Sequence, residues 1–91
     1  MNLKNKKALI IGVASNRSIA AAIATAFGLN EADLVLTFQT EKLKSRVEDI
    51  AREIDENIEC FPCDLSSDEE IVNLKNHIKK KWGKLDIIIH S

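Results

Sequence analysis

The ten residues Ile11-Gly12-Val13-Ala14-Ser15-Asn16-Arg17-Ser18-Ile19-Ala20 decide how this chain folds. A continuous apolar run over residues 8–11 leads into them, and apolar residues at helical spacing follow them. This pattern predicts a buried strand, a turn opened by Gly12 and a helix that begins at Ser18. A strand, a glycine turn and a helix N-terminus together form a cradle for the pyrophosphate of a nucleotide.

The glycine spacing of this segment departs from the common dinucleotide fingerprint. That fingerprint is G-x-G-x-x-G, and here only Gly12 is present, with Ser18 and Ala20 where later small residues are expected. An ordinary tight turn between a strand and a helix would also need a glycine. The polar residues at the end of the loop, just before the helix cap, favour nucleotide binding over that simpler explanation.

Strands and helices alternate along the rest of the chain. Continuous apolar runs predict strands over residues 7–12, 33–39, 58–64 and 85–89. Helical spacing predicts helices over residues 18–29, 43–54 and 67–82, the last with a capping box at Ser67 and Glu70 and a terminator at Gly83. This alternation predicts a parallel sheet with right-handed crossovers, ordered 3-2-1-4 in its doubly wound form.

The fold class predicted from this order is α/β, the N-terminal portion of a Rossmann-like doubly wound parallel sheet. In such sheets ligands bind where the strand order reverses, beyond the carboxyl ends of the strands. Gly12 follows the first strand and His90-Ser91 closes the fourth, so these residues flank the reversal point. Pro62 within the third strand indicates an edge position, as the order 3-2-1-4 requires.

Composition limits the partners of the chain. Its 91 residues form at most one small domain, with 45% hydrophobic residues and a net charge of −1. Such a charge gives no reason to expect nucleic acid or a membrane as a partner. The apolar part of the N-terminus is short and interrupted by Gly12, so a signal peptide is disfavoured and we expect a cytoplasmic protein.

The end of the second predicted strand bears on the choice of cofactor. Folds that bind nicotinamide dinucleotides read the adenosine ribose there, with an acid for a free 2′-hydroxyl or a basic residue for a 2′-phosphate. Gln39 can bond a hydroxyl and Glu41 would repel a phosphate, whereas Arg17 could reach a phosphate from the loop. NADH is therefore favoured over NADPH. Gln39 could also be an ordinary polar strand end.

Cys60-Phe61-Pro62-Cys63 matches C-x-x-C, a spacing found in redox and zinc sites. Redox pairs normally lie at a helix start, but here both cysteines fall on a predicted strand, where positions i and i+3 face opposite sides. We therefore expect structural cysteines and no metal site.

Five segments together resemble the bacterial enoyl-acyl carrier protein reductases, a divergent branch of the short-chain dehydrogenase/reductase family. They are Gly12-Val13-Ala14-Ser15, Ser18-Ile19-Ala20, Thr37-Phe38-Gln39, Cys63-Asp64-Leu65 and His90-Ser91, all in family order and spacing. The resemblance implies an NADH-dependent enzyme that reduces the trans-2 double bond of an acyl chain on acyl carrier protein during fatty acid elongation. It also implies a homo-oligomer, a tetramer in the complete protein.

The resemblance also implies a set of cofactor-binding residues. By position, Gly12, Ser18, Ile19 and Ala20 would surround the pyrophosphate and the nearby ribose. Gln39 would lie at the adenosine end, Asp64 and Leu65 at the adenine pocket, and Ser91 close to the nicotinamide half. Asp64 could equally serve a local turn or helix cap, and the two roles are compatible.

The chain departs from the family in two ways. Glu31 stands at a helix-to-strand turn where glycine is usual, so we expect that turn to be built differently, and the chain contains no tyrosine. The family's catalytic tyrosines and lysine follow the fourth strand, so we expect no catalytic residue in this chain. Residues 1–91 are therefore expected to be the N-terminal, dinucleotide-binding part of one larger domain, with the rest of the sheet missing and no reductase activity alone.

Other functions remain to be separated from this one. Another short-chain reductase acting on ketones or alcohols would share the cofactor site, and a non-catalytic nucleotide-binding module would need no tyrosine. A signalling receiver domain also alternates strands and helices and places an aspartate where Asp64 lies. Such a domain needs an acidic pair after its first strand to hold Mg²⁺, and Val13-Ala14-Ser15 cannot supply one.

Overall fold

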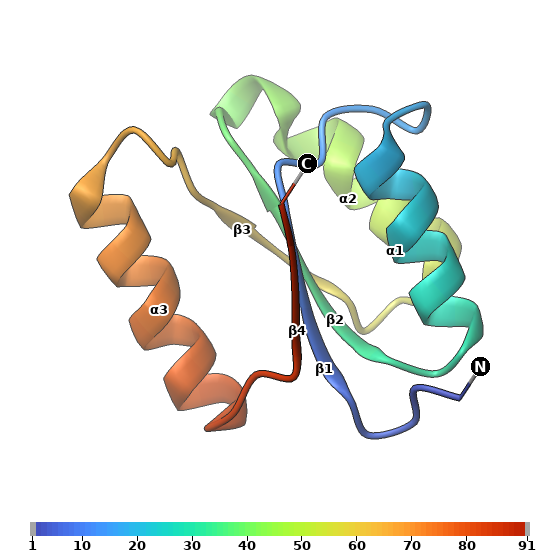
Figure 1. Ribbon diagram of the computed structural model, residues 1–91. Coiled ribbons are helices and arrows are strands. Elements are labelled where there is room, and N and C mark those ends of the chain that lie inside the picture. Colours follow the sequence, from blue (N-terminus) through green and yellow to red (C-terminus); the bar gives the residue numbers. More distant parts are fainter. Residues whose placement is uncertain (1, 91) are drawn as a thin grey trace.

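The computed structural model describes residues 2–90 as one four-stranded parallel sheet with helices on both faces. The strands are β1 (Lys7–Ile11), β2 (Asp33–Phe38), β3 (Glu59–Pro62) and β4 (Ile87–His90). Their order is β3-β2-β1-β4, which confirms the predicted order (Figure 1). The third strand is shorter than predicted because the chain turns away from β2 after Cys63, whose N–H still reaches the Phe38 carbonyl oxygen at 2.9 Å.

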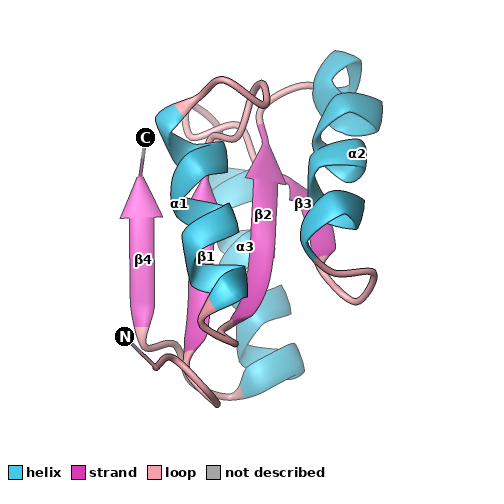
Figure 2. Cartoon of the chain, turned by 90° about the vertical axis from the view of Figure 1, so that its right-hand side faces the viewer, coloured by secondary structure: helices cyan, strands magenta, loops and turns pink. Residues whose placement is uncertain are grey.

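Three α-helices cover the sheet. They are α1 (Ile19–Leu29), α2 (Lys44–Ile54) and α3 (Asp68–Trp82), and a short 3-10 turn, η1 (Glu41–Leu43), precedes α2. Helices α1 and α2 lie on one face and α3 lies on the other (Figure 2). This is the arrangement that right-handed crossovers require, since the chain reverses its direction across the sheet between β3 and β4. None of these helices is both long and apolar enough to cross a lipid bilayer.

Each face of the sheet has its own apolar core. Beneath α1 and α2, the buried side chains include Ile10, Leu36 and Phe38, while Leu9 and Val35 face α3. Successive residues of β1 and β2 alternate between the two cores because side chains of a strand point to opposite faces. Both strands are therefore apolar without alternation, as predicted for central strands.

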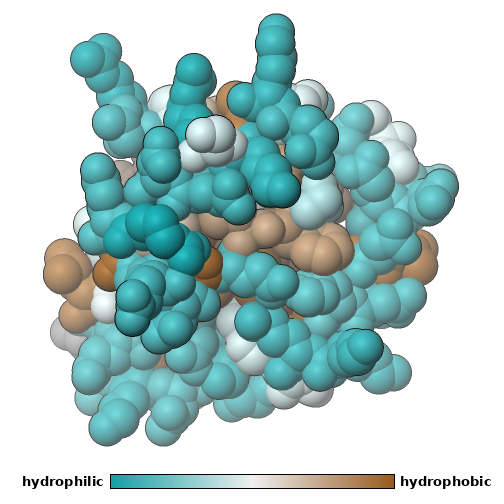
Figure 3. All heavy atoms as spheres, turned by 180° about the vertical axis from the view of Figure 1, so that it is seen from behind, coloured by the Kyte–Doolittle hydropathy of each residue, from teal (hydrophilic) through white to brown (hydrophobic). Residues whose placement is uncertain are grey.

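The two edges of the sheet differ. β3 ends at Pro62, as predicted for an edge. Figure 3 views the molecule from this side and shows a band of apolar atoms across the middle, with further apolar atoms at the margins, among hydrophilic side chains. At the opposite edge, β4 pairs with β1, and Ile88 is 59% exposed. A groove of about 320 Å³, lined mostly by apolar side chains, lies between β4 and α3. Ile88 lines this groove together with Leu74 of α3.

The turn between α1 and β2 contains a left-handed residue that is not glycine. Glu31 has a φ of 70°, a value that L-residues other than asparagine rarely adopt. The Ala32 N–H donates to the Phe27 carbonyl oxygen at 3.1 Å, which closes the end of α1. Glu31 therefore holds a left-handed position with a full side chain, at a cost in backbone strain.

Candidate functional site

The loop that follows β1 is fixed to β2 by a single residue, Thr37. Gly12 has a φ of 85°, which suits glycine, and its N–H donates to Thr37 Oγ1 at 3.2 Å. The next N–H, of Val13, donates to the Thr37 carbonyl oxygen at 3.0 Å. Both bonds hold the start of the loop against the end of the neighbouring strand.

The N-terminus of α1 follows this loop. Ser18 is its N-cap, as predicted, because Ser18 Oγ accepts from the Ala21 N–H at 3.1 Å and donates to the Ser15 carbonyl oxygen at 2.8 Å. Within residues 2–90, the N–H groups of Ile19 and Ala20 have no hydrogen-bond partner. Free N–H groups at the positive end of a helix dipole are suited to bind an anion.

Gln39 and Asp64, which follow β2 and β3, lie beside each other. The Asp64 carboxylate accepts hydrogen bonds from the Ser66 hydroxyl at 2.7 Å and the Ser66 N–H at 2.9 Å. These bonds, with a smaller contribution from the Gln39 side chain, hold the pKa of Asp64 below its usual value. The Asp64 turn is thus the predicted local turn, and it presents an ionised carboxylate next to Gln39.

The acid Glu70 of α3 holds the Asp64 turn in place. Its Oε1 atom accepts the Asp64 N–H at 3.0 Å, while its own N–H donates to Ser67 Oγ at 3.2 Å. The predicted capping box is therefore only half formed, because the Glu70 carboxylate bonds Asp64 and the Ser67 N–H bonds the Asp64 carbonyl oxygen instead. The half that forms still starts α3 at the predicted cap.

Strand register brings the predicted site residues together at one end of the sheet, beyond the carboxyl ends of the strands. Ile11 pairs with His90, so Gly12 lies next to the end of β4. Phe38 pairs with Pro62, so Gln39 lies next to the chain that leads to Asp64. Ile19 and Leu65 are exposed at this end, whereas Ala20 is fully buried. Ser91, the remaining predicted residue, lies outside the described residues.

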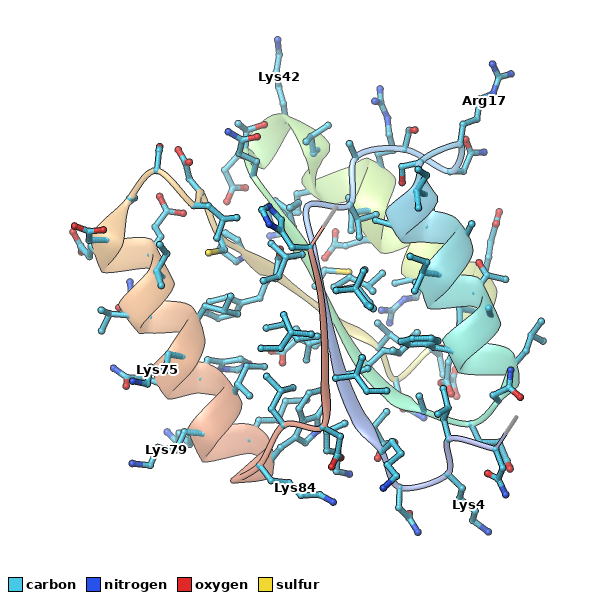
Figure 4. The ribbon with its side chains drawn as sticks, viewed as in Figure 1. Lys4, Arg17, Lys42, Lys75, Lys79 and Lys84 are labelled. Atoms are coloured by element: carbon cyan, nitrogen blue, oxygen red, sulfur yellow. The ribbon has the colours of Figure 1, made fainter. Side chains whose placement is uncertain are left out.

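A groove of about 400 Å³ lies beside Gln39, at the carboxyl ends of β2 and β3. Gln39, Glu41, Phe61 and Glu70 are among its lining residues. With Asp64 nearby, its charged side chains are acidic, which disfavours an additional phosphate there. Arg17 is exposed and extends into solvent from the loop, as does Lys42 from η1 (Figure 4). Lys75 and Lys79 lie further along α3, away from this end of the sheet, and line the groove between α3 and β4.

The cysteines face opposite sides of β3, as predicted. Cys60 Sγ lies 3.8 Å from the Val47 carbonyl oxygen of α2, and Cys63 Sγ lies 3.8 Å from that of Glu70 in α3. Burial raises the pKa of the Cys60 thiol to about 11. A thiol with such a pKa is protonated at neutral pH and reacts slowly. Among residues 2–90, no three His, Cys, Asp or Glu side chains group as metal ligands would.

Sequence reasoning missed two residues that organise this end of the sheet. Thr37 is the one buried polar residue among those described, and a threonine inside the run Leu34-Val35-Leu36-Thr37-Phe38 could have signalled a buried hydrogen bond. For Glu70, the sequence pattern predicts a role in the helix cap alone. No local pattern predicts its bond to Asp64, because a glutamate at this position can reach either the Ser67 N–H or the Asp64 N–H.

Comparison with known proteins agrees with this geometry. Residues 12–91 match the family model for enoyl-(acyl carrier protein) reductase. Over 89 residues, the chain is 47% identical to the NADH-dependent enoyl-[acyl-carrier-protein] reductase FabI of Aquifex aeolicus and 40% identical to that of Haemophilus influenzae. These matches cover 98% of this chain but 33% and 34% of the two relatives. The chain therefore spans about a third of the length of the curated relatives it matches.

Solved structures also match most of this chain and about a third of their own length. The crystal structure of the Aquifex aeolicus reductase superposes with a TM-score of 0.88 at 46% identity, covering 97% of this chain and 38% of that one. The reductase of Anaplasma phagocytophilum, solved in complex with NAD, gives a TM-score of 0.88 at 35% identity, covering 94% of this chain and 32% of that one. The strand order and the helix placement described above are thus those of this group of structures.

Proposed function

The chain belongs to the enoyl-acyl carrier protein reductase family, and on this basis we propose that it forms the NADH-binding part of such an enzyme. The reaction is reduction of the trans-2 double bond of an acyl chain carried by acyl carrier protein, in fatty acid elongation. Residues 1–91 would then be one part of a larger dinucleotide-binding domain.

The observation that carries this proposal is the pairing of the Gly12 turn with the open start of α1. The turn follows a central strand, and the N–H group of the exposed residue Ile19 is free to bind an oxygen atom of a pyrophosphate. Gly12, Ser18, Ile19 and Ala20 are the residues proposed to surround the pyrophosphate and its neighbouring ribose. Ser18 acts there by capping the helix, since its hydroxyl already donates to the Ser15 carbonyl oxygen and accepts from the Ala21 N–H.

The adenosine end is proposed to lie at Gln39, Asp64 and Leu65. Gln39 can donate to or accept from a ribose hydroxyl, and the ionised Asp64 can accept from an amino group or a hydroxyl. Glu41 and Glu70 add negative charge to the same groove. This charge supports NADH over NADPH, because a 2′-phosphate would have to approach two carboxylates without a basic partner inside the groove. Ser91 is proposed to lie near the nicotinamide half.

These residues fit the cofactor but do not supply the catalytic groups. When bound, NADH supplies the hydride of the reaction. The residues of this chain would hold its phosphates, orient its adenosine and keep its position fixed relative to the sheet. No tyrosine occurs in the chain, so we assign no catalytic residue to it. The substrate carried by acyl carrier protein, the tetrameric assembly and the cytoplasmic location of the whole protein are parts of the same proposal.

The test is to measure the kcat/KM of the full-length protein with NADH and NADPH, using an enoyl thioester as substrate. We expect turnover with a preference for NADH. A parallel assay with ketone and alcohol substrates separates this activity from that of other short-chain reductases. Cofactor binding without turnover of any of these substrates would instead identify a non-catalytic nucleotide-binding module.

A further inference from the structure

We propose that Thr37 is the positioning residue of the phosphate-binding loop. It does not touch the cofactor; its side chain fixes the Gly12 N–H so that the loop and the start of α1 are preformed for the pyrophosphate. The inference rests on the proposed function, since it assigns the loop to a dinucleotide phosphate.

The environment of Thr37 makes its hydroxyl unusual. The residue is fully buried, its strand neighbours Leu36 and Phe38 are apolar, and no other polar residue is buried within the described chain. A hydroxyl in such surroundings is unfavourable unless it is hydrogen-bonded. Thr37 Oγ1 accepts the Gly12 N–H at 3.2 Å, so the hydroxyl and the loop satisfy each other.

Among the side-chain hydrogen bonds of the loop in the described structure, the one from Thr37 is the only one that comes from a distant segment. Those of Ser15 and Ser18 stay within the loop and the first turn of α1. Thr37, in contrast, lies 25 residues after Gly12 in the chain. Its side-chain oxygen accepts the Gly12 N–H, and its carbonyl oxygen accepts the Val13 N–H. A residue with a φ of 85° has several other conformations within reach, and the bond from Oγ1 selects one of them.

Thr37 also joins the two ends of the proposed site. Thr37 is a residue of β2 and lies two positions before Gln39, which follows that strand. The bond between Thr37 and Gly12 therefore sets the distance between the phosphate loop and the adenosine end. If the contact is lost, the Gly12 N–H loses its partner and the loop can move relative to Gln39. Binding of the phosphates should suffer, whereas binding of the adenosine part alone should not.

The experiment uses two variants of the full-length protein with opposite chemistry. Thr37→Val keeps the shape of the side chain and removes the acceptor, whereas Thr37→Ser keeps the acceptor and removes a methyl group. Thr25→Val is the matched control, because the Thr25 hydroxyl bonds only the Ala21 carbonyl oxygen of its own helix, at 2.9 Å. Calorimetric titration with NADH, ADP and adenosine gives the dissociation constants.

We expect Thr37→Val to weaken NADH and ADP by about tenfold, the effect of one lost hydrogen bond, and to leave adenosine unchanged. Thr37→Ser and Thr25→Val should bind all three ligands as the parent protein does. Equal losses for Thr37→Val and Thr37→Ser, or equal losses for ADP and adenosine, would mean that Thr37 has only a structural role and would overturn the inference. Unchanged ADP binding in Thr37→Val would overturn it as well.

Failure of the proposed function gives a different result, because the parent protein itself would then bind neither NADH nor ADP. If Thr37→Val does not fold, amide hydrogen exchange decides the question in the parent protein and in Thr37→Ser. The Gly12 N–H should be strongly protected in both, and rapid exchange at Gly12 would contradict the assignment.

Discussion

The Glu59 carboxylate of β3 and the His77 imidazole of α3 are joined by a contact of 2.6 Å between Glu59 Oε1 and His77 Nε2. Phe61 stacks on the His77 ring, with 4.4 Å between ring centroids, and Lys81 Nζ lies 3.3 Å from the same Glu59 oxygen. This cluster fastens α3 to the edge strand. Because α3 also carries Glu70, the cluster supports the element that holds the Asp64 turn.

Stability should fall when Glu59 is protonated. Burial raises the pKa of Glu59, but the hydrogen bond and charge of His77, together with Lys81, outweigh burial and hold this pKa below the ordinary value of 4.5. A carboxyl group with a lowered folded-state pKa stabilises the fold fully above its unfolded-state value, and this contribution is lost as the pH falls through the folded-state value. We expect the loss to be less than about 1 kcal/mol, because the group is partly exposed.

The measurement is the free energy of unfolding of the parent protein and Glu59→Gln at pH 7 and at several points below pH 4.5. The difference between the two proteins should shrink as the pH falls. A constant difference over this range would show that the ion pair does not contribute. Glu56→Gln is a suitable control, because the Glu56 side chain is exposed and forms no ion pair in the described structure.

Gly28 should not tolerate alanine, although alanine favours helices. A Cβ atom at this position in α1 would lie 2.3 Å from Ile54 Cγ2 of α2. We expect Gly28→Ala to destabilise the protein by about 1–3 kcal/mol, the usual cost of overpacking. Chemical denaturation of Gly28→Ala, Ile54→Ala and the double variant gives the coupling between the two sites. The double variant should be more stable than the sum of the single effects predicts, and simple additivity would argue against the clash.

Glu31→Gly should stabilise the protein. Glu31 has a φ of 70°, and glycine adopts this conformation without the clash of a Cβ atom, a gain of about 1 kcal/mol. Thermal unfolding of the variant should show a raised Tm. Asn5→Gly is the matched control, because Asn5 has a φ of 68° but asparagine tolerates this region better. A gain at Asn5 equal to that at Glu31 would show that the strain is not specific to the glutamate.

Gly12→Val tests the phosphate loop in the full-length protein. A β-branched residue at a φ of 85° is strained, and its side chain would stand where the pyrophosphate is proposed to approach. We expect severe weakening of NADH binding while the circular dichroism spectrum stays close to that of the parent protein. Undiminished affinity for NADH would show that the loop does not cradle phosphate.

The sequence predicted the strand order because it depends on local patterns and on one general rule. Apolar runs define β1 and β2, and Ser18 and Ser67 mark helix starts. The right-handedness of crossovers then decides on which face of the sheet each helix lies. The placement of Gly12 and Gln39 at one end of the sheet follows from the same order. Their roles in binding a cofactor, and that of Ser91, stay predictions.

Contacts that depend on register could not be predicted. The bond between Gly12 and Thr37 requires that β1 and β2 pair with Leu9 opposite Val35, and the apolar pattern of two fully buried strands does not fix that choice. Glu70 had two N–H groups within reach and bonded Asp64. Such choices are decided by packing between elements, on which single-sequence patterns carry no information.

Cys60 of β3 and Cys63, just after it, face opposite sides of the sheet, and this has a consequence for measuring how the protein opens. Cys60 packs against the core beneath α1 and α2, and Cys63 belongs to the core beneath α3. Cys63 is buried and Cys60 is partly exposed. Each thiol becomes more accessible to alkylation when its own layer separates from the sheet, so the two labelling rates respond to different layers. Pulsed alkylation read out by mass spectrometry could therefore measure which layer cofactor binding tightens, without introducing any probe into the chain.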